Sequence, residues 1–73
     1  MNKTEFIAAV ADILEISPQG LQGPEVLEDI GNWDSLSIIS FVAMVDADLN
    51  QSVNPEKLKQ ARTLDDLAAL VGL

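Results

Sequence analysis

The chain has 73 residues, which is enough for one domain with one small hydrophobic core. It contains no cysteine and no histidine, so disulfides, thiol nucleophiles and the common Ser–His or Cys–His catalytic arrangements are excluded. For the same reason we do not expect a free-standing enzyme. Its formal net charge of −8 disfavours binding to nucleic acid or to an anionic membrane, so we expect neither partner.

The first predicted element is a helix over residues 3–15. Asn2 followed by Glu5 is typical of a capping box at its start. Its apolar residues recur at helical spacing on one face: Phe6, Val10, Ile13 and Leu14. Acidic residues interrupt the stretch, which indicates an amphipathic helix and not an export signal. We therefore expect a cytoplasmic location.

Residues 17–33 are predicted to form a long connection. Two prolines and two glycines between residues 18 and 24 end the first helix by Ser17. The rest of the segment has apolar residues but little clear periodicity. Because so long a loop is unusual in a small domain, we expect it to pack across the helices.

A second helix is predicted over residues 35–49. Gly31 and Asn32 mark a turn, and Asp34 is a good N-cap, which puts Ser35 in the first helical turn. One side of this helix is assigned to the core: Ile38, Phe41, Val42, Val45 and Leu49. Another group of residues is expected roughly opposite the core: Ser37, Ser40, Ala47 and Asp48.

A further apolar stripe on this helix comprises Leu36, Ile39 and Ala43, flanked by Asp46. Small domains always expose some apolar surface, so the stripe has a purely structural interpretation. It is also the pattern of a face on which partner proteins dock. Its closeness to Ser35 favours docking.

Two more helices complete the domain. Asn54 and Pro55 begin a short third helix. Thr63 and Asp66 form a second capping box, and Gly72 suits the position after the last helix. The predicted fold is all-α, a small four-helix bundle of three longer helices and one short helix, with a long loop between the first and second helices.

Ser35 is the residue on which a function could depend. No histidine is present to activate it, so it is a poor nucleophile by itself. The free N–H groups and the dipole at a helix N-terminus would stabilise a phosphodiester there. Asp34 would oppose that anion, unless it serves a modifying enzyme. Local chemistry therefore permits modification of Ser35 without requiring it.

The stretch LEDIGNWDSLSIISFVAMVDADL, residues 27–49, resembles the carrier-protein family, which comprises acyl carrier proteins and the related peptidyl and aminoacyl carriers. In that family a short acidic domain carries phosphopantetheine on the serine of an Asp-Ser-Leu motif, which falls here on Asp34, Ser35 and Leu36. The resemblance spans nearly the whole chain and implies a single acyl-carrier-like domain over residues 1–73.

The resemblance also implies a mechanism. A phosphopantetheinyl transferase would move the arm from coenzyme A to the Ser35 hydroxyl, and the arm's thiol would hold an acyl or aminoacyl group as a thioester. Partner enzymes would load, alter and unload this group, so the chain itself would need no catalytic residue and no metal. The partner contacts implied by the family are Leu36, Ile39, Ala43, Asp46 and Val53.

Two features depart from the carriers of fatty-acid synthesis. Those carriers usually place acids on the outer face soon after the serine, where this chain has Ser37 and Ser40. The segment between Gly31 and the motif is also one residue longer than usual, and it contains Trp33, which we expect to anchor the loop. Both departures favour a specialised pathway, such as that of a polyketide, a nonribosomal peptide or a modified sugar.

Three hypotheses stay open at this point: a stand-alone carrier, a carrier domain from a larger synthase, and an unmodified helical adaptor that acts through its apolar stripe. The start at Met1 and the end just after the last helix favour the stand-alone carrier, and we expect a monomer. An enzyme is the most remote alternative, because adjacent acids on a helix point apart and are not set up for acid–base catalysis.

Overall fold

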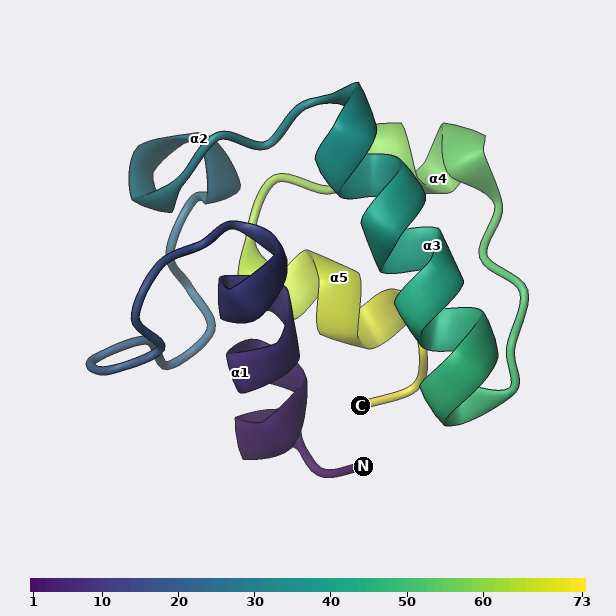
Figure 1. The fold of residues 1–73 in the computed structure, drawn as a ribbon, viewed down its shortest axis with the longest axis horizontal. Coiled ribbons are helices and arrows are strands. Elements are labelled where there is room, and N and C mark those ends of the chain that lie inside the picture. The colour runs from purple at the N-terminus through teal and green to yellow at the C-terminus, as the bar shows by residue number, and fades with distance from the viewer.

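Every regular element of the protein is a helix. The computed structural model describes all residues from 1 to 73. Five helices follow one another along the chain (Figure 1): α1 (Lys3–Ile13), α2 (Leu27–Ile30), α3 (Ser35–Leu49), α4 (Pro55–Gln60) and α5 (Leu64–Leu70). None of them combines the length and the apolarity that crossing a membrane would require. The predicted all-α class is confirmed.

The predicted number of helices is one too few. The additional helix, α2, is a single turn of four residues inside the segment predicted to be a loop. A single turn is too short to show a periodic pattern, and it has no side-chain cap. Tertiary contacts hold it instead, because Leu27 is fully buried and its N–H donates to the Arg62 carbonyl oxygen at 2.8 Å.

The two predicted capping boxes are confirmed. At the start of α1, the Glu5 N–H donates to Asn2 Oδ1 at 2.8 Å, and the Asn2 N–H donates to Glu5 Oε1 at 3.1 Å. At the start of α5, the Asp66 N–H donates to Thr63 Oγ1 at 3.1 Å, and the Thr63 N–H donates to Asp66 Oδ2 at 3.2 Å. The first helix ends at Ile13, two residues earlier than predicted.

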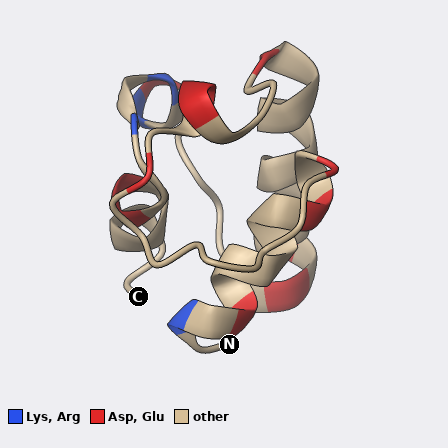
Figure 2. Ribbon diagram, turned by 90° about the vertical axis from the view of Figure 1, so that its left-hand side faces the viewer, with Lys and Arg blue, Asp and Glu red and all other residues tan.

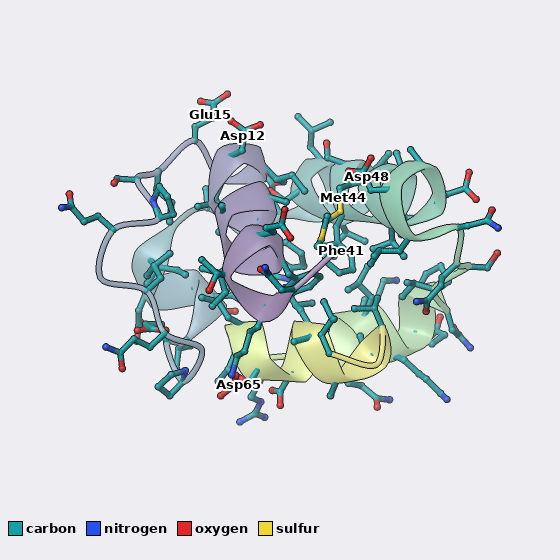
Figure 3. The ribbon with its side chains drawn as sticks, turned by 90° about the horizontal axis from the view of Figure 1, so that it is seen from below. Asp12, Glu15, Phe41, Met44, Asp48 and Asp65 are labelled. Atoms are coloured by element: carbon teal, nitrogen blue, oxygen red, sulfur yellow. The ribbon has the colours of Figure 1, made fainter.

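Four helices pack in a ring around the core. In this ring α1 contacts α3 and α5, and α4 also contacts α3 and α5. Each of the five helices supplies at least one fully buried side chain from the set Phe6, Val10, Leu27, Phe41, Val45, Leu58, Leu64 and Leu67. Figure 3 shows Phe41 inside the ring, whereas Asp12, Glu15 and Asp65 point away from it. The core is therefore apolar and shared by all the helices.

The segment before α2 is fixed to the segment before α5. Val26 and Thr63 form an antiparallel bridge. The Leu64 N–H donates to the Glu25 carbonyl oxygen at 3.2 Å, and the Asp65 N–H donates to the Gly23 carbonyl oxygen at 2.8 Å. The expectation that the long connection packs across the helices is confirmed.

Candidate functional site

Ser35 is an exposed residue, the first of α3. Asp34 caps this helix, because its Oδ1 accepts from the Ser37 N–H at 3.0 Å. Helix geometry leaves the N–H groups of Ser35 and Leu36 without intrahelical acceptors. No acidic residue lies in the first turn of α3. The serine hydroxyl therefore lies at the surface, at the positive end of the longest helix dipole in the molecule.

The Asp34 carboxylate is held by donors from both sides of the cap. In addition to its bond with the Ser37 N–H, Oδ1 lies 3.2 Å from the Ser37 hydroxyl, and Oδ2 accepts from Asn32 Nδ2 at 3.2 Å. The backbone hydrogen bond from Ser37 is the main reason why the pKa of Asp34 is lowered, with the Ser37 hydroxyl contributing in the same direction. The predicted N-cap is confirmed, and it puts a negative charge next to Ser35 at neutral pH.

Ser37 does not face outward, and the prediction that it lies opposite the core is wrong. Only 7 % of its surface is exposed. Its hydroxyl donates to the Asn32 carbonyl oxygen at 2.9 Å, so the incoming loop covers it. At 100° per residue, Ser37 lies only about 40° around the helix from the buried Phe41, so the helical spacing itself places Ser37 at the edge of the core face and the predicted position was misassigned. The predicted core face of α3 is confirmed, because Phe41 and Val45 are fully buried. The other three residues assigned to it are half-buried and pack against the core: Ile38, Val42 and Leu49.

Trp33 anchors the loop that leads to Ser35, as predicted. The indole is half-buried and packs edge-on against Phe41, with ring centroids 6.1 Å apart and an interplanar angle of 77°. Phe41 also packs edge-on against Phe6, with ring centroids 5.8 Å apart and an interplanar angle of 90°. Three aromatic rings thus connect the loop, α3 and α1. The residue just before the Asp-Ser-Leu motif is fixed to the centre of the core.

The predicted partner residues lie mostly in one place. Leu36 and Ile39 are 70 % and 65 % exposed, which is the highest exposure among the large apolar residues. Four of the five predicted residues line one surface hollow of about 480 Å³, together with Val42, Gln51 and Ser52: Ile39, Ala43, Asp46 and Val53. The fifth, Leu36, lines a different hollow beside Asp34. We call the first of these hollows the α3 groove.

Three residues of the α3 groove were not predicted from the sequence. Val42 was assigned to the core, and it is half-buried between the core and the groove. Gln51 and Ser52 lie in the connection to α4, and Gln51 Nε2 donates to the Val71 carbonyl oxygen at 3.2 Å. This bond joins residues 20 positions apart, so no local pattern could have revealed it.

The charges are distributed unevenly over the surface. Acidic residues are spread over all the helices, whereas the basic residues lie on α4, just after it, and near the N-terminus (Figure 2). The single ion pair joins Lys3 Nζ to Asp65 Oδ1 at 2.6 Å. No group of three or more acidic side chains is arranged to hold a metal ion.

An acidic helical domain with an exposed serine in the first turn of its longest helix has the features of a carrier domain. A family model described as a phosphopantetheine attachment site matches residues 4–71. Because the match covers nearly the whole chain, the chain belongs to this family of carrier proteins. Searches of curated proteins and of solved structures gave no match.

Family membership implies a covalently attached phosphopantetheine group. Carrier domains of this family are in general not catalytic, and they interact with phosphopantetheinyl transferases and with enzymes that handle acyl groups. The residues at the start of α3 fit such a group, because an exposed hydroxyl lies beside helix N–H groups that would stabilise a phosphodiester.

Proposed function

We propose that the chain carries acyl or aminoacyl intermediates as thioesters on a phosphopantetheine arm attached to Ser35. The observation that supports this proposal is the exposed serine at the first position of α3, inside the region that the family model matches. The arm supplies a thiol to a chain that has no cysteine. Tethering raises the effective concentration of the intermediate at each partner enzyme.

In the attachment step, Ser35 Oγ forms a bond to phosphorus while the pyrophosphate bond of coenzyme A breaks and the adenosine bisphosphate leaves. The hydroxyl proton passes to a base of the transferase, because this chain has no histidine to accept it. Asp34 keeps α3 capped during this step and presents its charge beside the hydroxyl. We infer that this charge helps to hold a cation or the coenzyme in the transferase.

The α3 groove is our proposed contact for partner enzymes. Ile39, Ala43 and Val53 offer apolar surface that a partner can cover, and Asp46 offers a charge to a basic patch. Asp46 lies 11 residues after Ser35, so it is about 16 Å farther along the helix axis. A partner would therefore contact the middle of α3 while its active site receives the arm.

We propose a specialised pathway, such as that of a polyketide, a nonribosomal peptide or a modified sugar, and not bulk fatty-acid synthesis. The support is the low charge of the first half of α3, where Ser37 is buried and Ser40 is neutral. The acidic residues of this helix, Asp46 and Asp48, both lie in its second half. Recognition of the first half therefore depends on apolar contact.

The test is the intact mass of the chain after incubation with coenzyme A, Mg²⁺ and a broad-specificity phosphopantetheinyl transferase. We expect a gain of one phosphopantetheine on the parent chain and no gain on a Ser35→Ala variant. A Ser40→Ala variant is the matched control, because it removes a hydroxyl from the same helix and should be modified normally. If a folded parent chain gains no mass with several transferases, the proposal is wrong, and the unmodified adaptor replaces it.

A further inference from the structure

A second hollow lies between α2, the loop before α3 and the connection from α4 to α5. Its volume is about 520 Å³. Its apolar lining comes from Val26, Leu27, Trp33 and Ala61, and its polar lining comes from Glu28, Lys59, Arg62 and Thr63. We call it the α2 hollow. It shares no residue with the α3 groove.

The α2 hollow contains positive charge that has no partner. All the bases of this acidic chain except Lys3 lie between residues 57 and 62. Lys59 and Arg62 are exposed, and neither forms an ion pair. Two carboxylates lie nearby: Glu28 lines the same hollow, and Asp66 is close enough to Arg62 for the Arg62 charge to help lower its pKa. Two unpaired bases beside an apolar wall form a site for a ligand that is apolar along its length and anionic at its end.

The α2 hollow also lies close to the start of the arm. Trp33 lines it and is two residues before Ser35, so the Cα atoms of these residues are at most about 7 Å apart. The indole is fixed against Phe41, which holds this wall in place. An arm attached to Ser35 would therefore start beside the hollow, next to its apolar wall.

We propose that the α2 hollow receives the cargo of the arm, and that this cargo is a dicarboxylic acyl group. One carboxyl would form the thioester, the carbon chain would lie along Trp33 and Val26, and the free carboxylate would pair with Lys59 and Arg62. This inference rests on the proposed function. The phosphate of the arm is another anion that the same bases could bind, so the test must separate the two sources.

The experiment loads the chain from coenzyme A, butyryl-coenzyme A or succinyl-coenzyme A, with intact mass confirming each product. The two acyl groups have the same number of carbons, and only succinyl has a free carboxylate. Trp33 is the single tryptophan and lines the α2 hollow, so its indole N–H gives one resonance that can be assigned to this wall. We expect a displaced resonance in the succinyl form relative to the other two forms.

Variants identify the bases responsible. In the succinyl form, Lys59→Gln or Arg62→Gln should lower the ratio of docked to free cargo about twofold to fivefold, as expected for the loss of an exposed ion pair. Lys57→Gln is the matched control, since it removes the same charge from the same helix at a residue that does not line the hollow. It should leave the resonance unchanged.

Each other outcome overturns the inference in a distinct way. Equal displacement in the butyryl and succinyl forms would mean that the hollow does not select a carboxylate. If the indole resonance of the form with the unloaded arm is already displaced as far as that of the succinyl form, Lys59 and Arg62 bind the phosphate of the arm and not the cargo. No displacement in any form of confirmed mass would place the cargo outside the hollow. These three results leave the proposed function intact, whereas the absence of any mass gain contradicts the proposed function itself.

Discussion

Phe41 is the side chain that links the proposed attachment site to the core, and its replacement gives the sharpest test of the packing. It is fully buried in α3 and packs edge-on against both the Phe6 ring and the Trp33 indole. Phe41→Leu keeps an apolar side chain at the position and removes both aromatic contacts. Phe6→Leu, at an equally buried position, removes only one of them.

The two contacts determine the size of the effect. An edge-to-face aromatic pair contributes about 0.5–1.5 kcal/mol beyond the area it buries, so Phe41→Leu should lower the free energy of unfolding by about 1–3 kcal/mol. Phe6→Leu should lower it by about 0.5–1.5 kcal/mol. A single core in a domain of this size without disulfides rarely supplies more than about 3–5 kcal/mol, so Phe6→Leu should still fold and Phe41→Leu should come nearer to unfolding.

Urea unfolding followed by far-ultraviolet circular dichroism gives the free energies of the parent chain, of both single variants and of the double variant. The double variant should lose less than the sum of the single losses, because the pair between Phe6 and Phe41 is counted in both single variants. Equal losses in the two single variants, or a loss below about 0.5 kcal/mol for Phe41→Leu, would refute the three-ring arrangement.

Three further predictions concern the loop, the carboxylates and the cap. Gly23→Ala should lower the free energy of unfolding, measured in urea, by about 1–3 kcal/mol, because its φ of +133° is strained for alanine and a Cβ there would collide with the Asp65 carboxylate. Gly20→Ala should lower it less, because a Cβ at residue 20 meets no neighbouring atom. The reverse order would contradict the loop geometry. Hydrogen bonds from backbone N–H groups lower the pKa values of Glu25, Asp34 and Asp66 below the ordinary values of 4.5 for glutamate and 3.8 for aspartate. The ionised carboxylates therefore stabilise the fold at a pH above these ordinary values, and the stabilisation is lost as the pH falls through the lowered pKa values. Carboxyl resonances titrated in the folded and urea-unfolded chain should show the lower midpoint in the folded state, and an equal or higher midpoint would count against the prediction. Asp34→Asn should keep α3 capped, because asparagine also caps helices well, and should lose only the stability that depends on the Asp34 charge. It should also slow transfer of the arm severalfold, and unchanged transfer would assign Asp34 a structural role alone.

The parts of the fold that are encoded locally could be predicted from the sequence. The bounds of α3 at residues 35 and 49 were predicted correctly, because Asp34 caps one end and the apolar pattern stops at the other. Both capping boxes were predicted for the same reason, since their bonds join residues three apart. Local chemistry was thus sufficient to find the helix that carries Ser35.

The parts that depend on distant residues could not be predicted. The one-turn helix α2 forms because Leu27 is buried and bonds to Arg62, which is 35 positions away in the chain. Helical spacing alone places Ser37 about 40° from the buried Phe41, and only the hydrogen bond that covers its hydroxyl depends on the loop through Asn32. The α2 hollow joins residues 26–33 to residues 59–63, and no local pattern indicates that Lys59 and Arg62 lie near Trp33.

The two parts of the candidate site therefore differ in how strongly the sequence constrains them. The attachment position needs only a cap, an exposed serine and a helix N-terminus, all within residues 34–37. The α2 hollow needs the tertiary pairing of two loops, and its charge comes from exposed side chains that the core does not use. Substitution of Lys59 or Arg62 would alter cargo preference without disturbing attachment or folding. A carrier chain could thus change its cargo at these surface positions while its attachment site and its core stay the same.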